Sequence, residues 1–138
     1  MGIVLEYECP KCGFEISETL GIGLGSMSES RSIRRQALAG EAYPELKPLF
    51  EQYPKDGRAV KFHRLCQCPQ CRKLQQSHCL IFEQEMAGEP GFLGLPKPKE
   101  ICRFRPICED CGIEMNEKNL VCPKCGTVLE SQSVGMWD

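Results

Sequence analysis

Short runs of apolar residues, separated by turn-forming residues, divide the chain into small elements. Runs of this length that are rich in aliphatic and aromatic side chains predict β-strands. We expect strands at 3–8, 14–20, 59–65, 73–82 and 127–133. The longest uninterrupted apolar run is the tetrapeptide CLIF at 79–82. Because a bilayer-spanning helix needs roughly 20 apolar residues, we expect no transmembrane helix.

A first helix is expected after the glycine-containing loop GIGLG at 21–25. The segment SMSE fits a capping box, with Ser26 as the N-cap and Glu29 three residues later. The helix is predicted from about 27 to 39. It ends at Gly40, a residue type that favours the position after a helix C-terminus.

A second helix is predicted within PELKPLFEQY at 44–53. Leu46, Leu49, Phe50 and Tyr53 follow the spacing of one buried helix face. Together the two helices form a helical insertion at about 26–54, which we expect to lie over the neighbouring strands.

Residues 86–99, MAGEPGFLGLPKPK, contain three glycines and three prolines and show little periodicity. This composition is typical of a linker between folded modules. Phe92, Leu93 and Leu95 form a short apolar island in it, which we expect to be exposed and to dock on the chain itself or on a partner.

Eight of the eleven cysteines form four C-x-x-C pairs. The pairs are Cys9 and Cys12, Cys68 and Cys71, Cys108 and Cys111, and Cys122 and Cys125. Two cysteines at this spacing on a tight turn, called a knuckle, direct both sulfurs at one metal ion, and two facing knuckles make a tetrahedral four-cysteine site. We therefore predict two metal sites of the zinc-ribbon type.

The spacing favours a particular pairing of the knuckles. Ten residues separate Cys111 from Cys122, enough for a short hairpin with its turn at 116–119. We therefore expect the last two knuckles to form one compact ribbon, and the first two to form a ribbon with a long insertion. In the alternative pairing both CPKCG copies serve one metal, which requires the two ends of the chain to meet.

Two features complicate the second knuckle. Cys66 offers an alternative ligand to Cys68, because the sequence reads CQCPQC. Arg72 replaces the glycine that follows the other three knuckles, so we expect a strained or differently shaped turn there. The remaining thiols, Cys79 and Cys102, are interpreted as small buried hydrophobic residues.

Composition places the chain in a reducing compartment. Paired C-x-x-C spacing, without a basic and apolar leader at the start, favours a cytoplasmic metal protein over a secreted disulfide scaffold. The net charge is −2, but residues 29–73 contain ten basic and five acidic residues. The middle third therefore presents a mildly basic face.

These basic residues support an alternative function, in which the protein binds nucleic acid rather than another protein. The candidate contacts to nucleic acid or to a partner are Arg31, Arg34, Arg35, Arg58, Lys61 and Arg64. Nucleic-acid-binding domains usually show a much stronger basic excess, and a solvated surface explains these charges as well.

Four thiolates suit Zn and also Fe. The Cys-Pro-x-Cys-Gly knuckle is similar to that of rubredoxin, an iron electron carrier, but rubredoxins surround the iron with aromatic residues. Here Trp137 lies only at the tail. Zinc is therefore the expected metal, with iron as the alternative. Four cysteines leave no open position for catalysis, and His63 and His78 are interpreted as strand residues.

The chain resembles small bacterial zinc-ribbon proteins of unassigned role. The resemblance lies in YECPKCG at 7–13, the glycine-containing stretch, a helical region ending near Pro54–Gly57, the second knuckle and the final CPKCG. It implies a fold and a metal but no substrate.

Taken together, the sequence predicts a small metal-stabilised α+β protein with two zinc-ribbon modules, at 1–85 and 100–138, joined by the linker at 86–99. We expect two structural zinc ions and no enzymatic activity. The expected role is that of a protein–protein adaptor or regulatory module, and the alternatives are a nucleic-acid-binding accessory factor and an electron carrier.

Overall fold

The computed structural model describes residues 2–21 and 26–137, which fall into two compact units. The first unit comprises Met1–Gly23, Phe62–Cys79 and Arg105–Asp138. The second unit comprises Leu24–Lys61 and Leu80–Phe104. Both ends of the chain thus belong to one unit. The units differ in this way from the consecutive modules that the sequence suggests.

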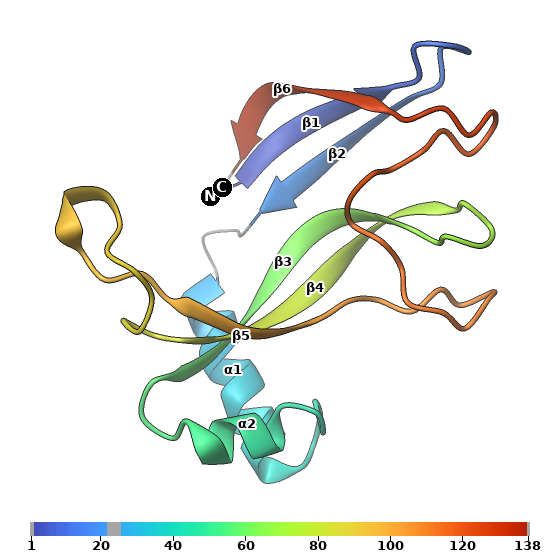
Figure 1. Ribbon diagram of the computed structural model, residues 1–138. Coiled ribbons are helices and arrows are strands. Elements are labelled where there is room, and N and C mark those ends of the chain that lie inside the picture. The colour runs from blue at the N-terminus through green and yellow to red at the C-terminus, as the bar shows by residue number, and fades with distance from the viewer. Residues whose placement is uncertain (1, 22–25, 138) are drawn as a thin grey trace. The chain divides into compact units, whose positions relative to one another are not determined.

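The first unit contains a three-stranded antiparallel arrangement with β1 at its centre (Figure 1). Strands β1 (Gly2–Glu8) and β2 (Glu15–Gly21) flank the first knuckle, and Glu8 pairs with Glu15. Strand β6 (Glu130–Trp137) pairs with the other edge of β1, so that Glu8 also faces Glu130. The C-terminal strand is therefore a neighbour of the N-terminal strand.

Strands β3 (Gly57–Gln67) and β4 (Leu74–Gln84) flank the second knuckle and lie side by side in the sheet. Each strand contributes residues to both units. In the first unit, β3 is joined to β2 by the pairing of His63 with Gly21. The strands predicted at 59–65 and 73–82 are thus present; β3 extends two residues beyond both predicted bounds, and β4 begins one residue later and ends two residues later than predicted.

The second unit packs two helices against strand residues. Helix α1 (Ser26–Ala39) ends before Gly40, which has φ 74°, and helix α2 (Lys47–Gln52) follows (Figure 1). The Ser26 side chain, which the sequence predicts as the N-cap, lies outside the described part of the chain. The loop at 22–25 also lies outside it. The core of the unit consists of Ile33, Ala37, Leu46, Phe50, Ala59, Leu80 and Phe82.

The predicted apolar face of the second helix is confirmed. Leu46 and Phe50 are fully buried, and Leu49 and Tyr53 pack against the same core. The Phe50 ring meets the Phe82 ring edge-to-face, with 5.1 Å between ring centroids. Close packing here explains Gly57, because a Cβ atom at this position would lie 2.6 Å from the Tyr53 carbonyl oxygen.

The segment predicted as a linker between modules instead connects two strands of the second unit. Strand β5 (Lys99–Phe104), which the sequence did not predict, pairs with β4. Between them, residues 86–98 form an ordered tongue (Figure 1). The Gly88 N–H donates to the Lys97 carbonyl at 2.7 Å, the Gly91 N–H donates to the Leu95 carbonyl at 2.8 Å, and the turn η1 (Phe92–Gly94) closes the tip.

The prediction of a local hairpin between the last two knuckles, with its turn at 116–119, is wrong. The Asn116 backbone exchanges two hydrogen bonds with Gln67, at 2.8 and 2.7 Å, so it cannot form the turn of a local hairpin. Residues 105–129 are held by isolated bridges, such as Ile107 with Glu114 and Val121 with Val128.

Neither of the helices described here is both long and apolar enough to cross a bilayer.

Candidate metal centres

The four knuckles share one backbone conformation. In each, the N–H of the first cysteine donates to the carbonyl oxygen five residues later. These bonds are Cys9 to Phe14 (2.8 Å), Cys68 to Lys73 (3.1 Å), Cys108 to Ile113 (2.8 Å) and Cys122 to Thr127 (2.7 Å). The residue after the second cysteine has positive φ in every case: Gly13 (77°), Arg72 (63°), Gly112 (71°) and Gly126 (77°). The common turn directs two sulfurs from each knuckle to one side.

Arg72 therefore adopts the same turn as the three glycines, and the expected difference in shape is not observed. A left-handed conformation costs a non-glycine residue about 1 kcal/mol. The Arg72 side chain has its own packing role, because a Cβ atom at Gly126 would lie 2.9 Å from its Nη1 atom. The guanidinium of the second knuckle thus lies against the backbone of the fourth.

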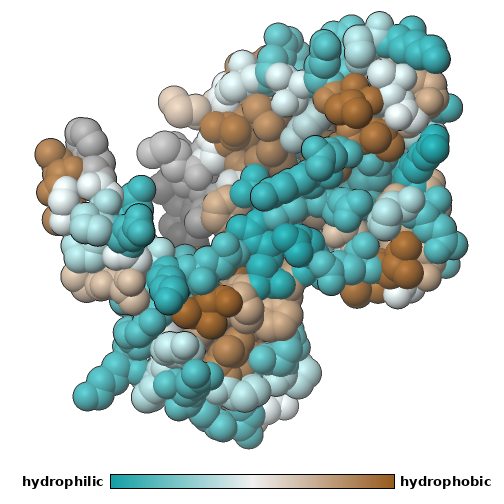
Figure 2. Space-filling model, viewed as in Figure 1, coloured by the Kyte–Doolittle hydropathy of each residue, from teal (hydrophilic) through white to brown (hydrophobic). Residues whose placement is uncertain are grey.

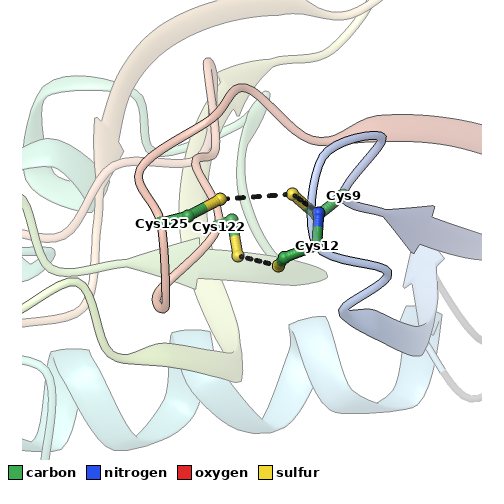
Figure 3. Close-up of side chains that lie close together, drawn as sticks. All are labelled: Cys9, Cys12, Cys122 and Cys125. Carbon is green, nitrogen blue, oxygen red and sulfur yellow. Dashed lines mark hydrogen bonds between the residues drawn. The ribbon is translucent and has the colours of Figure 1, made fainter.

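The first centre brings together the knuckles from the two ends of the chain (Figure 3). The Sγ atoms of Cys9 and Cys125 lie 3.4 Å apart, and those of Cys12 and Cys122 lie 3.5 Å apart. The Cys12 backbone N–H also donates to the Cys9 sulfur at 3.4 Å. Both CPKCG copies therefore belong to the same centre.

The second centre joins the two middle knuckles. It contains Cys68, Cys71, Cys108 and Cys111, and the Sγ atoms of Cys71 and Cys108 are 3.8 Å apart. Cys66 is not part of this group. It lies fully buried in a cluster with Cys68, Cys79, Cys108 and Met115.

The pairing favoured by sequence spacing is therefore wrong, and the alternative in which the chain ends meet is correct. The physical reason is the sheet: the pairing of β1 with β6 places Glu8 opposite Glu130. The knuckles that follow β1 and precede β6 then approach each other. A preference for short loops cannot reveal a pairing between strands at opposite ends of the chain.

Both groups fit a tetrahedral metal ion. With Zn–S distances of about 2.3 Å, the sulfurs of a regular tetrahedron lie about 3.8 Å apart. The measured separations of 3.4, 3.5 and 3.8 Å are close to this value, and all four sulfurs of each group lie within 4.8 Å of one another. In each knuckle the first cysteine is buried and the second is more exposed.

Local hydrogen bonds favour the thiolate form at Cys122 and Cys125 in the first centre and at Cys68 in the second. The Thr127 hydroxyl, 3.3 Å from the Cys125 sulfur, and the Thr127 backbone both stabilise the Cys125 thiolate, and with the neighbouring cysteines they lower the pKa of Cys125 to about 6. In the second centre, the Cys71 backbone N–H donates to the Cys68 sulfur at 3.4 Å. This bond, acting against burial, lowers the pKa of Cys68 to about 7. Thiolates are the form that binds metal.

Replacing Thr127 with valine is expected to make the first centre more sensitive to acid. Without the hydroxyl, the pKa of Cys125 rises toward its ordinary value, so protons displace the metal from that thiolate at a higher pH. We expect the first centre, which contains Cys125, to release its zinc at a higher pH than in the wild type, while the second centre releases its zinc at an unchanged pH. Release can be followed with a zinc-sensitive dye. The second centre serves as the internal control, and an upward shift of its release pH instead would contradict the assignment.

Gln67 links the two centres and was not identified from the sequence. Its side chain is almost fully buried, with 4 % exposure of the residue. Its Nε2 donates to the carbonyls of Arg72 (3.0 Å) and Val121 (2.7 Å), and its Oε1 accepts from the Val121 N–H at 2.8 Å. One side chain thus ties the backbone beside Cys68 to the backbone beside Cys122.

Glu117 is a second buried polar residue beside the second centre. Its side chain is only 4 % exposed. It accepts a hydrogen bond from the Cys79 thiol at 3.2 Å and lies 3.6 Å from the Arg105 guanidinium and 3.9 Å from that of Arg64. A lone glutamate between two turn residues gives no sequence signal for this role.

The basic residues predicted to contact a partner are mostly engaged within the protein. Arg34 donates to the carbonyls of Pro54 and Gly57, and Arg58 pairs with Glu83. In the same way, Lys61 pairs with Glu29 at 3.4 Å, and Arg64 pairs with Glu117. Arg31 and Arg35 are exposed on α1. Arg31, Arg34 and Arg58 line one pocket of the second unit, whereas Arg35 and Lys61 do not line it and Arg64 belongs to the first unit.

No protein-family model matches the chain, and no curated protein or solved structure matches it either. The assignment of the centres therefore depends on the geometry of the cysteines themselves.

Proposed function

We propose that the protein binds two structural zinc ions in a reducing cytoplasm and serves as a protein–protein adaptor or regulatory module. The observation that carries the zinc assignment is the pair of closed four-thiolate groups, each with the sulfur separations of a tetrahedral site. A catalytic zinc keeps a position for water or substrate. Four thiolates around one ion leave none, which favours a structural role.

The sequence of the knuckles also suits iron, so the metal itself is part of the proposal. Zinc is favoured because it has no redox chemistry and commonly fills closed four-cysteine sites whose only role is to stabilise the fold. Metal analysis of the protein purified from its host under reducing conditions tests this. Two zinc ions per chain are expected, whereas stoichiometric iron with visible charge-transfer absorption would favour an electron carrier.

The tongue is the feature that best supports an adaptor role. Leu93 and Leu95 are 80 % and 65 % exposed, and Met86 at its base is 73 % exposed. Figure 2 shows apolar side chains on the tongue at the left of the view. Leu93 also has φ 63°, a left-handed conformation that is unfavourable for leucine. Exposure and strain at the same residue suggest selection for binding rather than for stability.

The backbone of the tongue is held by its own hydrogen bonds and by one close approach. A Cβ atom at Gly88 would lie 2.6 Å from the Lys97 carbonyl oxygen, and one at Gly91 would lie 2.3 Å from the Lys97 Cε atom. At Gly88 the two backbone segments of the tongue therefore approach more closely than a residue with a Cβ atom allows, whereas the contact at Gly91 is to the flexible end of the Lys97 side chain. A preorganised apolar tip loses little conformational entropy when it enters a partner's pocket.

Replacing both Leu93 and Leu95 with aspartate is expected to abolish capture of the partner. Each buried leucine contributes about 1.5–3 kcal/mol, so losing two weakens binding on the order of 100-fold or more. The measurement is affinity capture from a nuclease-treated host lysate, followed by quantification of each recovered protein.

The matched control is Leu38→Asp, which changes an exposed leucine on α1 that is 40 % exposed. Unchanged capture by the tongue variant would contradict the proposed surface. Capture that depends on intact nucleic acid and is lost in Arg31→Glu with Arg35→Glu would instead favour the nucleic-acid-binding alternative.

A further inference from the structure

The chain contains only two histidines, and the fold places them in contact. His63 lies on β3 and His78 on β4, with ring centroids 4.3 Å apart and an angle of 61° between the ring planes. His63 is half-buried and His78 is exposed. The four-cysteine groups do not include either residue.

The second knuckle explains this contact. It closes with the hydrogen bond from the Cys68 N–H to the Lys73 carbonyl, which reverses the chain between β3 and β4. His63 lies five residues before Cys68, and His78 lies five residues after Lys73. Residues at equal distances from such a turn face each other on neighbouring strands, so the second centre fixes the position of both imidazoles.

Imidazole nitrogen is a preferred ligand of Cu²⁺, Ni²⁺ and Zn²⁺, and the affinity of one such site for divalent ions rises through Ni²⁺ to Cu²⁺. With a metal–nitrogen distance of about 2.1 Å, two nitrogens that bind one ion lie roughly 3 Å apart. Two rings whose centroids are 4.3 Å apart are close enough for one nitrogen of each to reach the same ion.

We propose that His63 and His78 form a third metal site, which binds a divalent ion of the Ni²⁺ or Cu²⁺ type in two adjacent coordination positions. Water completes the coordination sphere. The site differs in kind from the two thiolate centres, because it supplies two neutral nitrogen ligands, leaves positions open and is reached through the exposed His78. It therefore holds an exchangeable ion rather than a permanent structural one.

The test is a calorimetric titration of the zinc-loaded, full-length protein with Ni²⁺, which avoids the oxidation of thiols by Cu²⁺. We expect one Ni²⁺ to bind per chain without release of zinc. His78→Asn removes one ligand and with it the chelate, so the affinity should fall on the order of 100-fold. His63→Phe, which keeps a ring on β3 but removes the ligand, should give the same loss.

Zinc content and circular dichroism establish that each variant is folded, and the exposed position of His78 keeps the test valid if His63→Phe loses zinc. Ni²⁺ affinity that is unchanged in His78→Asn would overturn the proposal. The same conclusion follows if the zinc-loaded wild type fails to bind Ni²⁺ at millimolar concentration, or binds it only by displacing zinc.

Discussion

Removal of both metal ions with a strong chelator is expected to unfold the first unit while helix α1 of the second unit keeps its protection from hydrogen exchange. The buried clusters of the first unit depend heavily on cysteine: Cys9 and Cys122 belong to one, and Cys66, Cys68, Cys79 and Cys108 belong to the other. Each structural zinc contributes about 10–16 kcal/mol in apparent binding free energy, as much as the whole stability of a typical domain. In the second cluster Met115 is the only described buried residue that is not a cysteine, so few apolar contacts remain there without the metal, whereas the first cluster keeps Leu20, Leu65, Leu120 and Leu129.

The second unit has a core of ordinary apolar residues, including Phe50 and Phe82, and needs no metal ligand. Exchange measured by mass spectrometry before and after chelation separates the two units. Amides of β1, β6 and the knuckles should lose protection, whereas those of α1 (Ser26–Ala39) should keep most of it. Loss of protection throughout the chain, or in neither unit, would contradict this account.

Replacing Gln67 with leucine is expected to weaken both centres together. The substitution removes this partner from the N–H and carbonyl of half-buried Val121 and from the carbonyl of exposed Arg72. An unsatisfied buried polar group costs about 1–3 kcal/mol, and partial exposure lowers that cost, so we expect a loss of about 2 kcal/mol in the stability of the metal-bound first unit. Denaturant unfolding in excess zinc measures this directly.

The matched control is Gln70→Leu, which makes the same chemical change at an exposed position in the adjacent knuckle. It should alter stability by no more than about 0.5 kcal/mol. Competition with a chelator should also show that Gln67→Leu lowers zinc affinity at both centres. An effect confined to one centre would show that Gln67 does not couple them.

Much of the local structure could be predicted from the sequence. The spacing of Leu46, Leu49, Phe50 and Tyr53 predicts the buried face of α2, because these residues recur at the helical period. Likewise, the C-x-x-C spacing predicts four knuckles, since the geometry of each turn depends on only a few adjacent residues.

The pairing of the knuckles could not be predicted in the same way. It depends on the register between β1 and β6, which lie at opposite ends of the chain and carry no spacing signal for each other. The role of Gln67 was missed for a similar reason, because its partner Val121 is distant in sequence.

The tongue shows a different limit of sequence reasoning. Its glycines and prolines have the composition of a flexible linker, yet Gly88 is needed for the close approach of the Lys97 backbone. Composition alone does not distinguish a glycine that provides flexibility from one that permits tight packing. Strand β5 was missed with it, because it follows directly after this segment.

The central claim is that the two CPKCG knuckles bind one metal ion. It is tested most directly by replacing zinc with ¹¹³Cd and correlating each cadmium resonance with the β-protons of its cysteine ligands by NMR. We predict that one resonance correlates with Cys9, Cys12, Cys122 and Cys125, and the other with Cys68, Cys71, Cys108 and Cys111. Correlation of one cadmium with Cys9, Cys12, Cys68 and Cys71 would contradict the account.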